Sequence, residues 1–230
     1  RFGMQGMILQ TLRELDREAE LRGEEAYLGG VDNYQAATWL SHVLYSSVSG
    51  TVSAAAVAME WLRDVAKVAA SDGLPLWWTS PMGLPILQEY RNQKGVRVNA
   101  FWGGQRLQLM IQSDTEGLCS RSQVNGVAPN FVHSLDAAHL QAVALRGKQE
   151  GIRHLAVIHD SFGTHAADTG RLSRILRDTF VEQSSEDVLG SFYEDMKEQL
   201  GEDLAAKLTP PPKSGSLDLR PTLEAEYTLA

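Results

Sequence analysis

The chain has 230 residues, 43% of them hydrophobic and 22% charged, which is an ordinary balance for a folded protein with a sizeable core. This composition excludes wholesale disorder, and the single cysteine excludes an intrachain disulfide and fits a reducing compartment. The formal net charge of −8 argues at first sight against a polyanionic partner, but about −7 of it falls between positions 182 and 203, where eight acidic residues stand against one lysine, and the rest of the chain is nearly neutral.

The N-terminal segment lacks the apolar core of a signal peptide. Charged residues also interrupt the most apolar later stretch before it is long enough to span a bilayer. We therefore expect a cytoplasmic protein. Because the chain begins at Arg1 within a helical pattern, we also expect it to be part of a longer polypeptide, or a processed or split subunit.

Helical patterns occupy residues 1–73. Apolar residues recur at helical spacing over 4–22, where Gly23 ends the pattern, and again over 33 to about 70 as one long helix or two consecutive ones. Gly73 closes this part. The sequence therefore predicts a helical portion at the N-terminal end of the chain.

Residues 74–127 change to an extended pattern. Two apolar runs flank the turn SPMG (80–83), and two alternating runs flank the turn WGG (102–104). This region therefore predicts two β-hairpins.

Residues 128–230 return to helices, interrupted by one more hairpin. We predict a helix from Pro129, which suits a first helical turn, to Gly151, then a strand hairpin, then two further helices and a stiff triple-proline linker. The predicted fold is mixed α/β (α+β), helix-rich, with β-hairpins.

The stretch LAVIHDSFGT (155–164) places a carboxylate at the end of a strand. Four apolar residues, typical of a buried strand, precede His159 and Asp160, so Asp160 should emerge at a hairpin tip. This position suits Mg²⁺, which takes one or two carboxylates together with waters and substrate phosphates. An aspartate that makes a turn hydrogen bond is the alternative, and it is the commoner one for an isolated His-Asp pair.

A second candidate group lies near the start of the Pro129 helix. His133 and Asp136 are one helical turn apart and can share a face, with His139 three residues further on. A polar first turn, in which the helix dipole favours Asp136, is the alternative. The spacing does not match the patterns typical of zinc sites.

The 91–108 stretch is locally basic, and its alternation with period 2 sorts the side chains of the second hairpin. A two-stranded ribbon fits the DNA major groove, where Arg pairs with guanine edges and Asn or Gln with adenine edges. The solvated face of an amphipathic hairpin is the alternative. The residues on the polar face are Arg97, Asn99, Arg106 and Gln108.

Two motifs, VNGVAPNFVHSLDAAHL (124–140) and LAVIHDSFGTHAAD (155–168), together resemble the single-subunit, phage-type DNA-dependent RNA polymerases. The palm of that family carries a PNFVHS helix and an HDSFG hairpin. The initial RFG resembles the end of the family's fingers helix, RVNAFWGGQRLQ its promoter-specificity loop, and LDLRPTLEAEYTLA its terminal foot. The resemblance therefore extends over essentially the whole chain.

The resemblance implies part of a right-hand polymerase palm and fingers. Residues 1–73 would form a helical fingers portion, 74–127 the β-hairpin region with the specificity loop, and 128–230 the palm with the catalytic hairpin and foot. The implied activity is template-directed nucleotidyl transfer from ribonucleoside triphosphates by a two-magnesium mechanism. Its cofactor would be Mg²⁺, and its partners promoter DNA and the RNA transcript.

The resemblance also assigns roles to individual residues. Asp160 would be one of two metal-binding aspartates, His159 its neighbour at the tip, and His133 a histidine near the RNA 3′ end and the incoming nucleotide. The specificity-loop positions would be Arg97, Asn99, Arg106 and Gln108. The loop is one residue shorter than the family pattern, and Leu229 replaces a terminal aromatic residue.

The family's other catalytic aspartate, and its fingers lysine and tyrosine, precede the position of Arg1. We therefore expect an N-terminal polymerase portion to complete the active site, in the host cytoplasm if the protein is phage-encoded. The alternatives are a family A DNA polymerase fragment, a non-catalytic DNA-binding module that uses the 97–108 ribbon, and a structural subunit with a vestigial Asp160.

Overall fold

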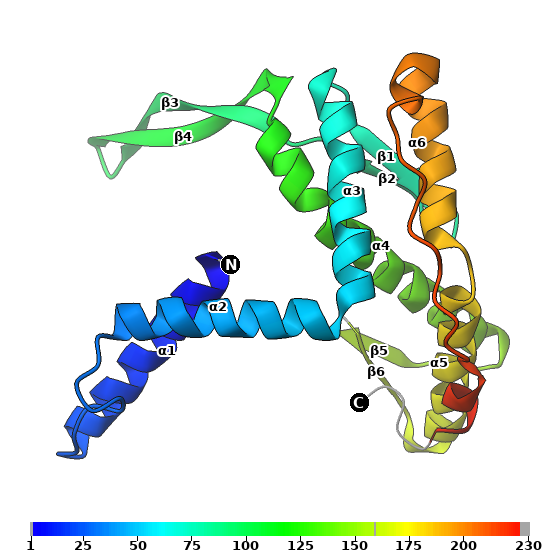
Figure 1. Cartoon of the computed structure of the whole chain (residues 1–230), viewed down its shortest axis with the longest axis horizontal. Coiled ribbons are helices and arrows are strands. Elements are labelled where there is room, and N and C mark those ends of the chain that lie inside the picture. Colours follow the sequence, from blue (N-terminus) through cyan, green and yellow to red (C-terminus); the bar gives the residue numbers. More distant parts are fainter. Residues whose placement is uncertain (1, 159, 226–230) are drawn as a thin grey trace. The chain divides into compact units, whose positions relative to one another are not determined.

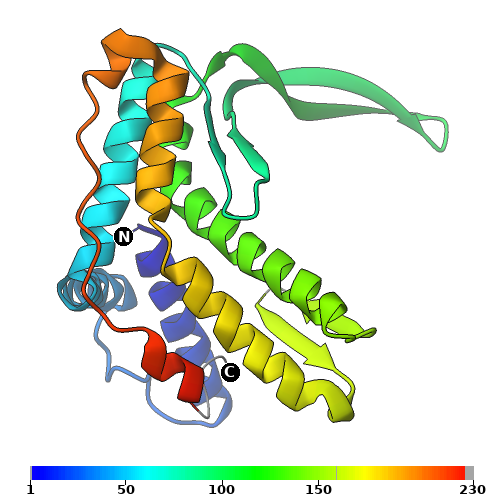
Figure 2. The same cartoon turned by 90° about the vertical axis from the view of Figure 1, so that its right-hand side faces the viewer.

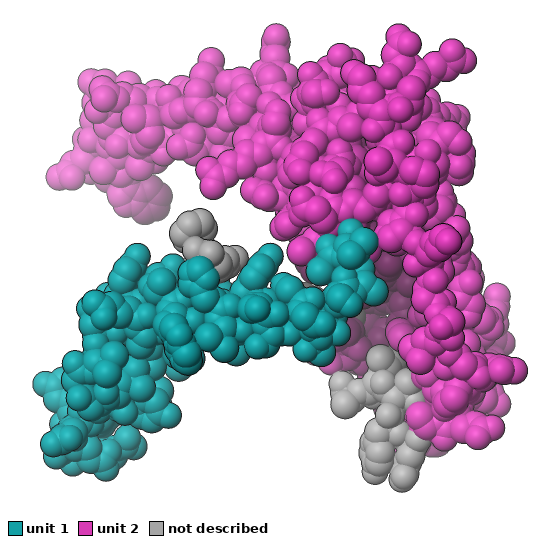
Figure 3. Space-filling model, in the orientation of Figure 1, with its two compact units in different colours: residues 1–57 teal, residues 58–230 magenta. Residues whose placement is uncertain are grey.

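The computed structural model of the chain describes residues 2–158 and 160–225. It separates into two compact units, residues 1–57 and 58–230, which Figure 3 shows in different colours. The mixed α/β, helix-rich fold is confirmed, because long helices are combined with three two-stranded antiparallel hairpins (Figure 1). The functional division at residues 73 and 127 stays a prediction. Among the described residues, no helix has both the length and the apolar character needed to cross a bilayer.

Unit 1 is built on two helices, as the sequence predicts. Helix α1 (Phe2–Leu21) and helix α2 (Asn33–Thr51) pack together. Asp32 begins α2 by accepting hydrogen bonds from the backbone N–H groups of its second and third residues, at 2.6 and 3.2 Å. Asp16 of α1 accepts a 2.6 Å hydrogen bond from the Asn33 side chain, which fixes the loop between the helices.

The main core of unit 2 joins α3, β1, α4 and α6. Four aromatic side chains meet there at largely edge-to-face angles, with Phe192 at ring-centre distances of 5.9 Å from Trp61, 5.7 Å from Trp78 and 5.2 Å from Phe131. The Trp61 indole N–H donates a 2.9 Å hydrogen bond to the Thr209 carbonyl, which ties the segment after α6 to this core. The elements of unit 2 are α3 (Ser53–Ser71, mostly in this unit), β1 (Leu76–Thr79), β2 (Pro85–Gln88), β3 (Arg91–Trp102), β4 (Gln105–Leu118), α4 (Ser120–Gln149), β5 (Leu155–Ile158), β6 (Ser161–Thr164), η1 (Ala166–Asp168), α5 (Thr169–Ser184), α6 (Val188–Ala205) and η2 (Arg220–Glu224).

Helix α4 begins nine residues before the predicted start at Pro129, so that prediction was wrong. Proline inside a helix costs about 3 kcal/mol because it removes one backbone hydrogen bond. The extra N-terminal turns are held from outside, because Gln88 of β2 donates hydrogen bonds to the backbone and side-chain oxygens of Gln123, at 2.9 and 3.0 Å. The backbone N–H of Cys119, the residue before α4, also donates a 2.8 Å hydrogen bond to the Tyr90 carbonyl. These contacts are tertiary, so the local sequence gives no sign of them.

Candidate active site

The β5–β6 hairpin carries Asp160 in a tight turn. Ile158 pairs with Ser161 at the end of the ladder, so the turn holds only positions 159 and 160. Asp160 is exposed, and within the described residues its carboxylate makes no hydrogen bond or ion pair. The turn hydrogen bond offered as the alternative is therefore not seen in that part of the chain. His159 lies outside the described residues, so its assigned place stays a prediction.

One face of the β5–β6 hairpin packs on helices. The opposite face is exposed and is called the bare face below. Leu155 and Phe162 pack against a small core of Val143, Leu172 and Ile175, contributed by α4 and α5 (Figure 2). Ala156 and Ile158, on the opposite face, are exposed, and Ile158 is 71% exposed. The prediction of a buried strand was wrong, because only one face of this two-stranded hairpin is covered by α4 and α5.

His139 connects α4 to this hairpin. Its ring packs edge-on against Phe162 of β6 and Phe180 of α5, each at 6.0 Å between ring centres. Its Nε2 lies 3.3 Å from the Leu176 carbonyl and 3.1 Å from the Thr179 hydroxyl. Because a carbonyl only accepts, the contact with Leu176 fits the tautomer that carries its proton on Nε2. Burial lowers the pKa of His139, which favours a neutral ring in this position.

His133 and Asp136 are both exposed on α4, three residues apart on one side of the helix. Neither makes a side-chain hydrogen bond within the described residues. His133 lies six residues before His139, a separation of about 9 Å along the helix axis. It therefore stands beyond the helix turn that contacts the hairpin, with its ring open to solvent.

The neighbours of His133 in the PNFVHS motif have structural roles. Phe131 lies in the aromatic core, and Asn130 donates hydrogen bonds to the side chains of Gln88 and Tyr90, at 2.8 and 3.0 Å. Ser134 is also buried and accepts a 3.0 Å hydrogen bond from the Trp78 indole N–H. His133 is thus the exposed ionisable group of a motif whose other polar side chains support the fold.

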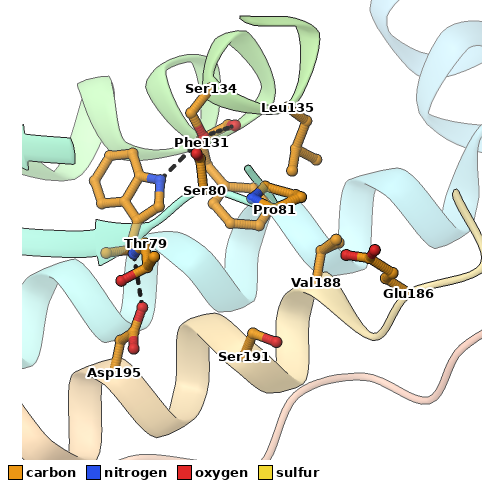
Figure 4. A pocket seen from close by; sticks show the side chains of 11 residues that line it. Thr79, Ser80, Pro81, Phe131, Ser134, Leu135, Glu186, Val188, Ser191 and Asp195 are labelled. Atoms are coloured by element: carbon orange, nitrogen blue, oxygen red, sulfur yellow. Dashed lines mark hydrogen bonds between the residues drawn. The ribbon is translucent and has the colours of Figure 1, made fainter. Parts of the chain in front are cut away.

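Ser134 also borders a cavity of about 270 Å³ that sequence reasoning missed (Figure 4). Asp195 of α6 accepts a 2.7 Å hydrogen bond from the Thr79 backbone N–H at its edge. The sequence offers no signal for this cavity, because its walls come from segments about fifty residues apart. Its lining residues are Trp78, Thr79, Ser80, Pro81, Phe131, Ser134, Leu135, Glu186, Val188, Ser191 and Asp195.

The β3–β4 hairpin brings the four predicted base-reading residues onto one face. In its register Asn99 lies opposite Gln108, and Arg97 lies opposite Met110. Arg106, opposite Phe101, donates a 3.2 Å hydrogen bond from Nε to the Asn99 side-chain oxygen. The same face also carries Phe101 and Met110, which are 74% and 60% exposed and which sequence reasoning missed. Both faces of the outer hairpin are solvent-exposed in this chain.

Unit 2 therefore carries one exposed catalytic candidate, Asp160, on the short β5–β6 hairpin. It also carries a long, exposed ribbon, the β3–β4 hairpin. A model of the DNA-dependent RNA polymerase family matches residues 1–211, so the chain belongs to this family. The resemblance to its phage-type members is confirmed by two relatives. The chain is 37% identical over 212 residues, or 85% of its length, to a DNA-directed RNA polymerase of Enterobacteria phage T3 and to the T7 RNA polymerase of Escherichia phage T7.

A plant relative is similar as well. The chain is 38% identical over 196 residues, 84% of its length, to DNA-directed RNA polymerase 3, chloroplastic, of Nicotiana sylvestris. These alignments cover only 24% of each phage relative and 19% of the plant relative. The chain thus spans about a quarter of the length of the phage relatives that it matches.

Proposed function

We propose that this chain is the C-terminal palm and fingers part of a DNA-directed RNA polymerase, and that Asp160 is one of its metal-binding carboxylates. In the reaction the 3′-hydroxyl of the RNA attacks the α-phosphate of a ribonucleoside triphosphate, and pyrophosphate leaves. The single observation that carries the proposal is the exposed Asp160 in the two-residue turn of an HDSFG hairpin, within a chain of this family.

The carboxylate of Asp160 fits Mg²⁺ as one ligand of a shared site. It is exposed and free of competing partners within the described residues, which suits an ion that retains waters and binds substrate phosphates. Bound Mg²⁺ would supply charge neutralisation at the triphosphate and activation of the 3′-hydroxyl. In this proposal Asp160 holds the ion and the packed hairpin fixes its position, because Leu155 and Phe162 anchor the strands to α4 and α5.

One carboxylate does not complete such a site. In the described part of the chain, no group of three or more His, Cys, Asp or Glu side chains is placed to hold a metal ion. We therefore propose that an N-terminal polymerase portion, outside these 230 residues, supplies the second aspartate and the fingers lysine and tyrosine. The cytoplasmic location expected from the sequence belongs to the same proposal.

We assign His133 to the RNA 3′ end or the incoming sugar, as a hydrogen-bonding group. Its exposure supports this assignment, because it leaves the ring nitrogens free for a ligand. We assign the β3–β4 ribbon to promoter recognition, with Arg97, Asn99, Arg106 and Gln108 as the base-reading side chains. Their position on one exposed face supports this role.

The Asp160→Asn substitution tests the catalytic proposal. It keeps the size of the side chain and removes the charge that would hold Mg²⁺, so we expect the polymerase to fold and bind promoter DNA normally. Phosphodiester formation should fall by several orders of magnitude, a loss of roughly 4 kcal/mol or more at about 1.36 kcal/mol per tenfold. The assay is transcription by the chain combined with its N-terminal portion.

Asp203→Asn is the matched control, because it removes the charge of another exposed carboxylate in the same unit. This variant should transcribe at the parent rate. Near-normal transcription by the Asp160→Asn polymerase would exclude a catalytic role for the His-Asp hairpin.

A further inference from the structure

A pair of histidines lies at the base of the β5–β6 hairpin, at the end away from Asp160. His154 and His165 occupy the next positions after the Leu155–Thr164 pair, and their rings meet edge to face with 4.8 Å between centres. Both side chains are exposed. Thr164 donates a 2.7 Å hydrogen bond from its hydroxyl to the His154 carbonyl, which fixes the backbone beneath the pair.

The two rings form one wall of a shallow cavity of about 540 Å³ along the bare face of the hairpin. Leu155, Thr164 and the Ala156–Gly163 pair also line it, and the Ala156–Gly163 pair adds only one methyl group to the exposed face, so an extended chain has room to lie against the strands. By strand alternation His154, Ala156 and Ile158 point to this same face. The face therefore runs without a large obstacle from the histidines to Ile158, beside the turn that carries Asp160.

The chemistry of the cavity favours an anion. Arg153 also lines it, and none of its lining residues is acidic. The carboxylates that flank the hairpin along the chain, Glu150 and Asp168, are ion-paired with Arg174 and Arg171 of α5, and Asp160 lies at the opposite end of the hairpin. A guanidinium and two imidazole N–H donors suit a phosphate oxygen, whereas the guanidinium would repel a metal ion.

We propose that this cavity binds a backbone phosphate of the RNA transcript, upstream of its reacting 3′ end; the inference rests on the proposed function of Asp160. His154 lies four residues before Ile158, or about 13 Å at 3.3 Å per residue. At roughly 3.4 Å per nucleotide along the axis of a nucleic-acid duplex that lies parallel to the hairpin, this corresponds to a phosphate about four nucleotides from the 3′ end. The contact forms only once the transcript is longer than about three nucleotides.

The test measures binding without chemistry, so its result does not depend on whether Asp160 is catalytic. The polymerase, with its N-terminal portion, is bound to fluorescent DNA template scaffolds that carry an RNA of ten or of two nucleotides, in the absence of nucleoside triphosphates. For the ten-nucleotide RNA, the double variant His154→Ala/His165→Ala should bind about tenfold more weakly, as expected for the loss of a charge-assisted hydrogen bond. For the two-nucleotide RNA it should match the parent.

Two further variants separate the cavity from a general effect. Ala156→Leu fills part of the cavity and keeps every charge, so it should weaken binding of the longer RNA in the same way. His42→Ala removes an exposed histidine from unit 1 and should change nothing. Circular dichroism of each variant should match the parent, since His154, His165 and Ala156 are all exposed.

A neutral methylphosphonate linkage identifies the strand. Placed at the fourth phosphate from the RNA 3′ end, it should weaken binding by the parent polymerase and remove the difference between parent and double variant. The same linkage in the template strand should leave that difference intact. Equal affinity of parent and double variant for the ten-nucleotide RNA would overturn the proposal. It would also be overturned if the double variant lost as much affinity for the two-nucleotide RNA as for the ten-nucleotide RNA.

Discussion

Replacement of Ser134 by alanine should destabilise the protein without touching the catalytic hairpin. The Ser134 hydroxyl accepts a 3.0 Å hydrogen bond from the Trp78 indole N–H and donates a 2.6 Å bond to the Phe131 carbonyl. Trp78 is only 1% exposed, so Ser134→Ala leaves a buried donor without its partner. Such a loss costs about 1 to 3 kcal/mol.

The cavity beside Ser134 places the expected cost near the lower end of that range. At about 270 Å³ it has room for water, and a water molecule that reaches the freed indole N–H would recover part of the lost hydrogen bonding. We therefore expect the free energy of unfolding to fall by about 1 to 2 kcal/mol. Urea unfolding of the 230-residue chain, followed by circular dichroism, measures this value.

A double-mutant cycle with Trp78→Phe isolates the hydrogen bond from the packing. Once the indole N–H is absent, Ser134→Ala no longer leaves a buried donor without a partner. The double variant should therefore lose less free energy of unfolding than the sum of the two single variants, by about 0.5 to 1.5 kcal/mol. Ser191→Ala, on an exposed side chain at the edge of the same cavity, is the control and should be nearly neutral. A Ser134→Ala effect below about 0.5 kcal/mol, or full additivity with Trp78→Phe, would refute the reasoning.

Three further predictions concern single groups. His133→Ala should slow elongation or weaken the preference for ribonucleotides, with a smaller loss of activity than Asp160→Asn causes. An unchanged elongation rate together with an unchanged preference would contradict the role assigned to His133. Asn99→Ala or Gln108→Ala should alter base preference at one or two promoter positions by about 1 to 3 kcal/mol each, measured on a randomised promoter library, where an unchanged profile would contradict it. Because burial lowers the pKa of His139 in the folded state, the unfolded chain binds more protons below pH of about 6.5, so stability should fall as the pH drops below that value. His139→Gln should flatten that fall in urea titrations, and an identical pH dependence would show that His139 is not its source.

Local patterns predicted most of the secondary structure, because helix periodicity, strand alternation and glycine turns act over a few residues. The Trp102-Gly103-Gly104 turn is an example, since Gly103 and Gly104 both adopt positive φ, at 58° and 77°, as a tight two-residue hairpin requires. The same alternation placed Arg97 and Gln108 on one face. It did not show that β3 and β4 extend well beyond the predicted runs, because exposed polar residues carry little strand signal.

The pairing of His154 with His165 was accessible from sequence in principle. The two residues lie at equal distances from the 159–160 turn, so hairpin symmetry alone brings them opposite each other. The cavity beside them was not accessible in this way. It depends on the burial of the opposite face by α4 and α5, which leaves only one side of the hairpin open.

The sequence by itself determined the family, the order of helices and hairpins, and the exposed turn that carries Asp160, because motifs, periodicity and turn residues are local properties. Only the tertiary structure decided which motif residues point inward. Ser134 is buried and His133 exposed because the Trp78 indole and the aromatic core lie on one side of α4. Packing between segments distant in the sequence determines which side of α4 is buried. Such packing also stabilises the helical turns before Pro129, through hydrogen bonds from Gln88. These contacts depend on long-range complementarity of shape and polarity, which no short stretch of sequence specifies.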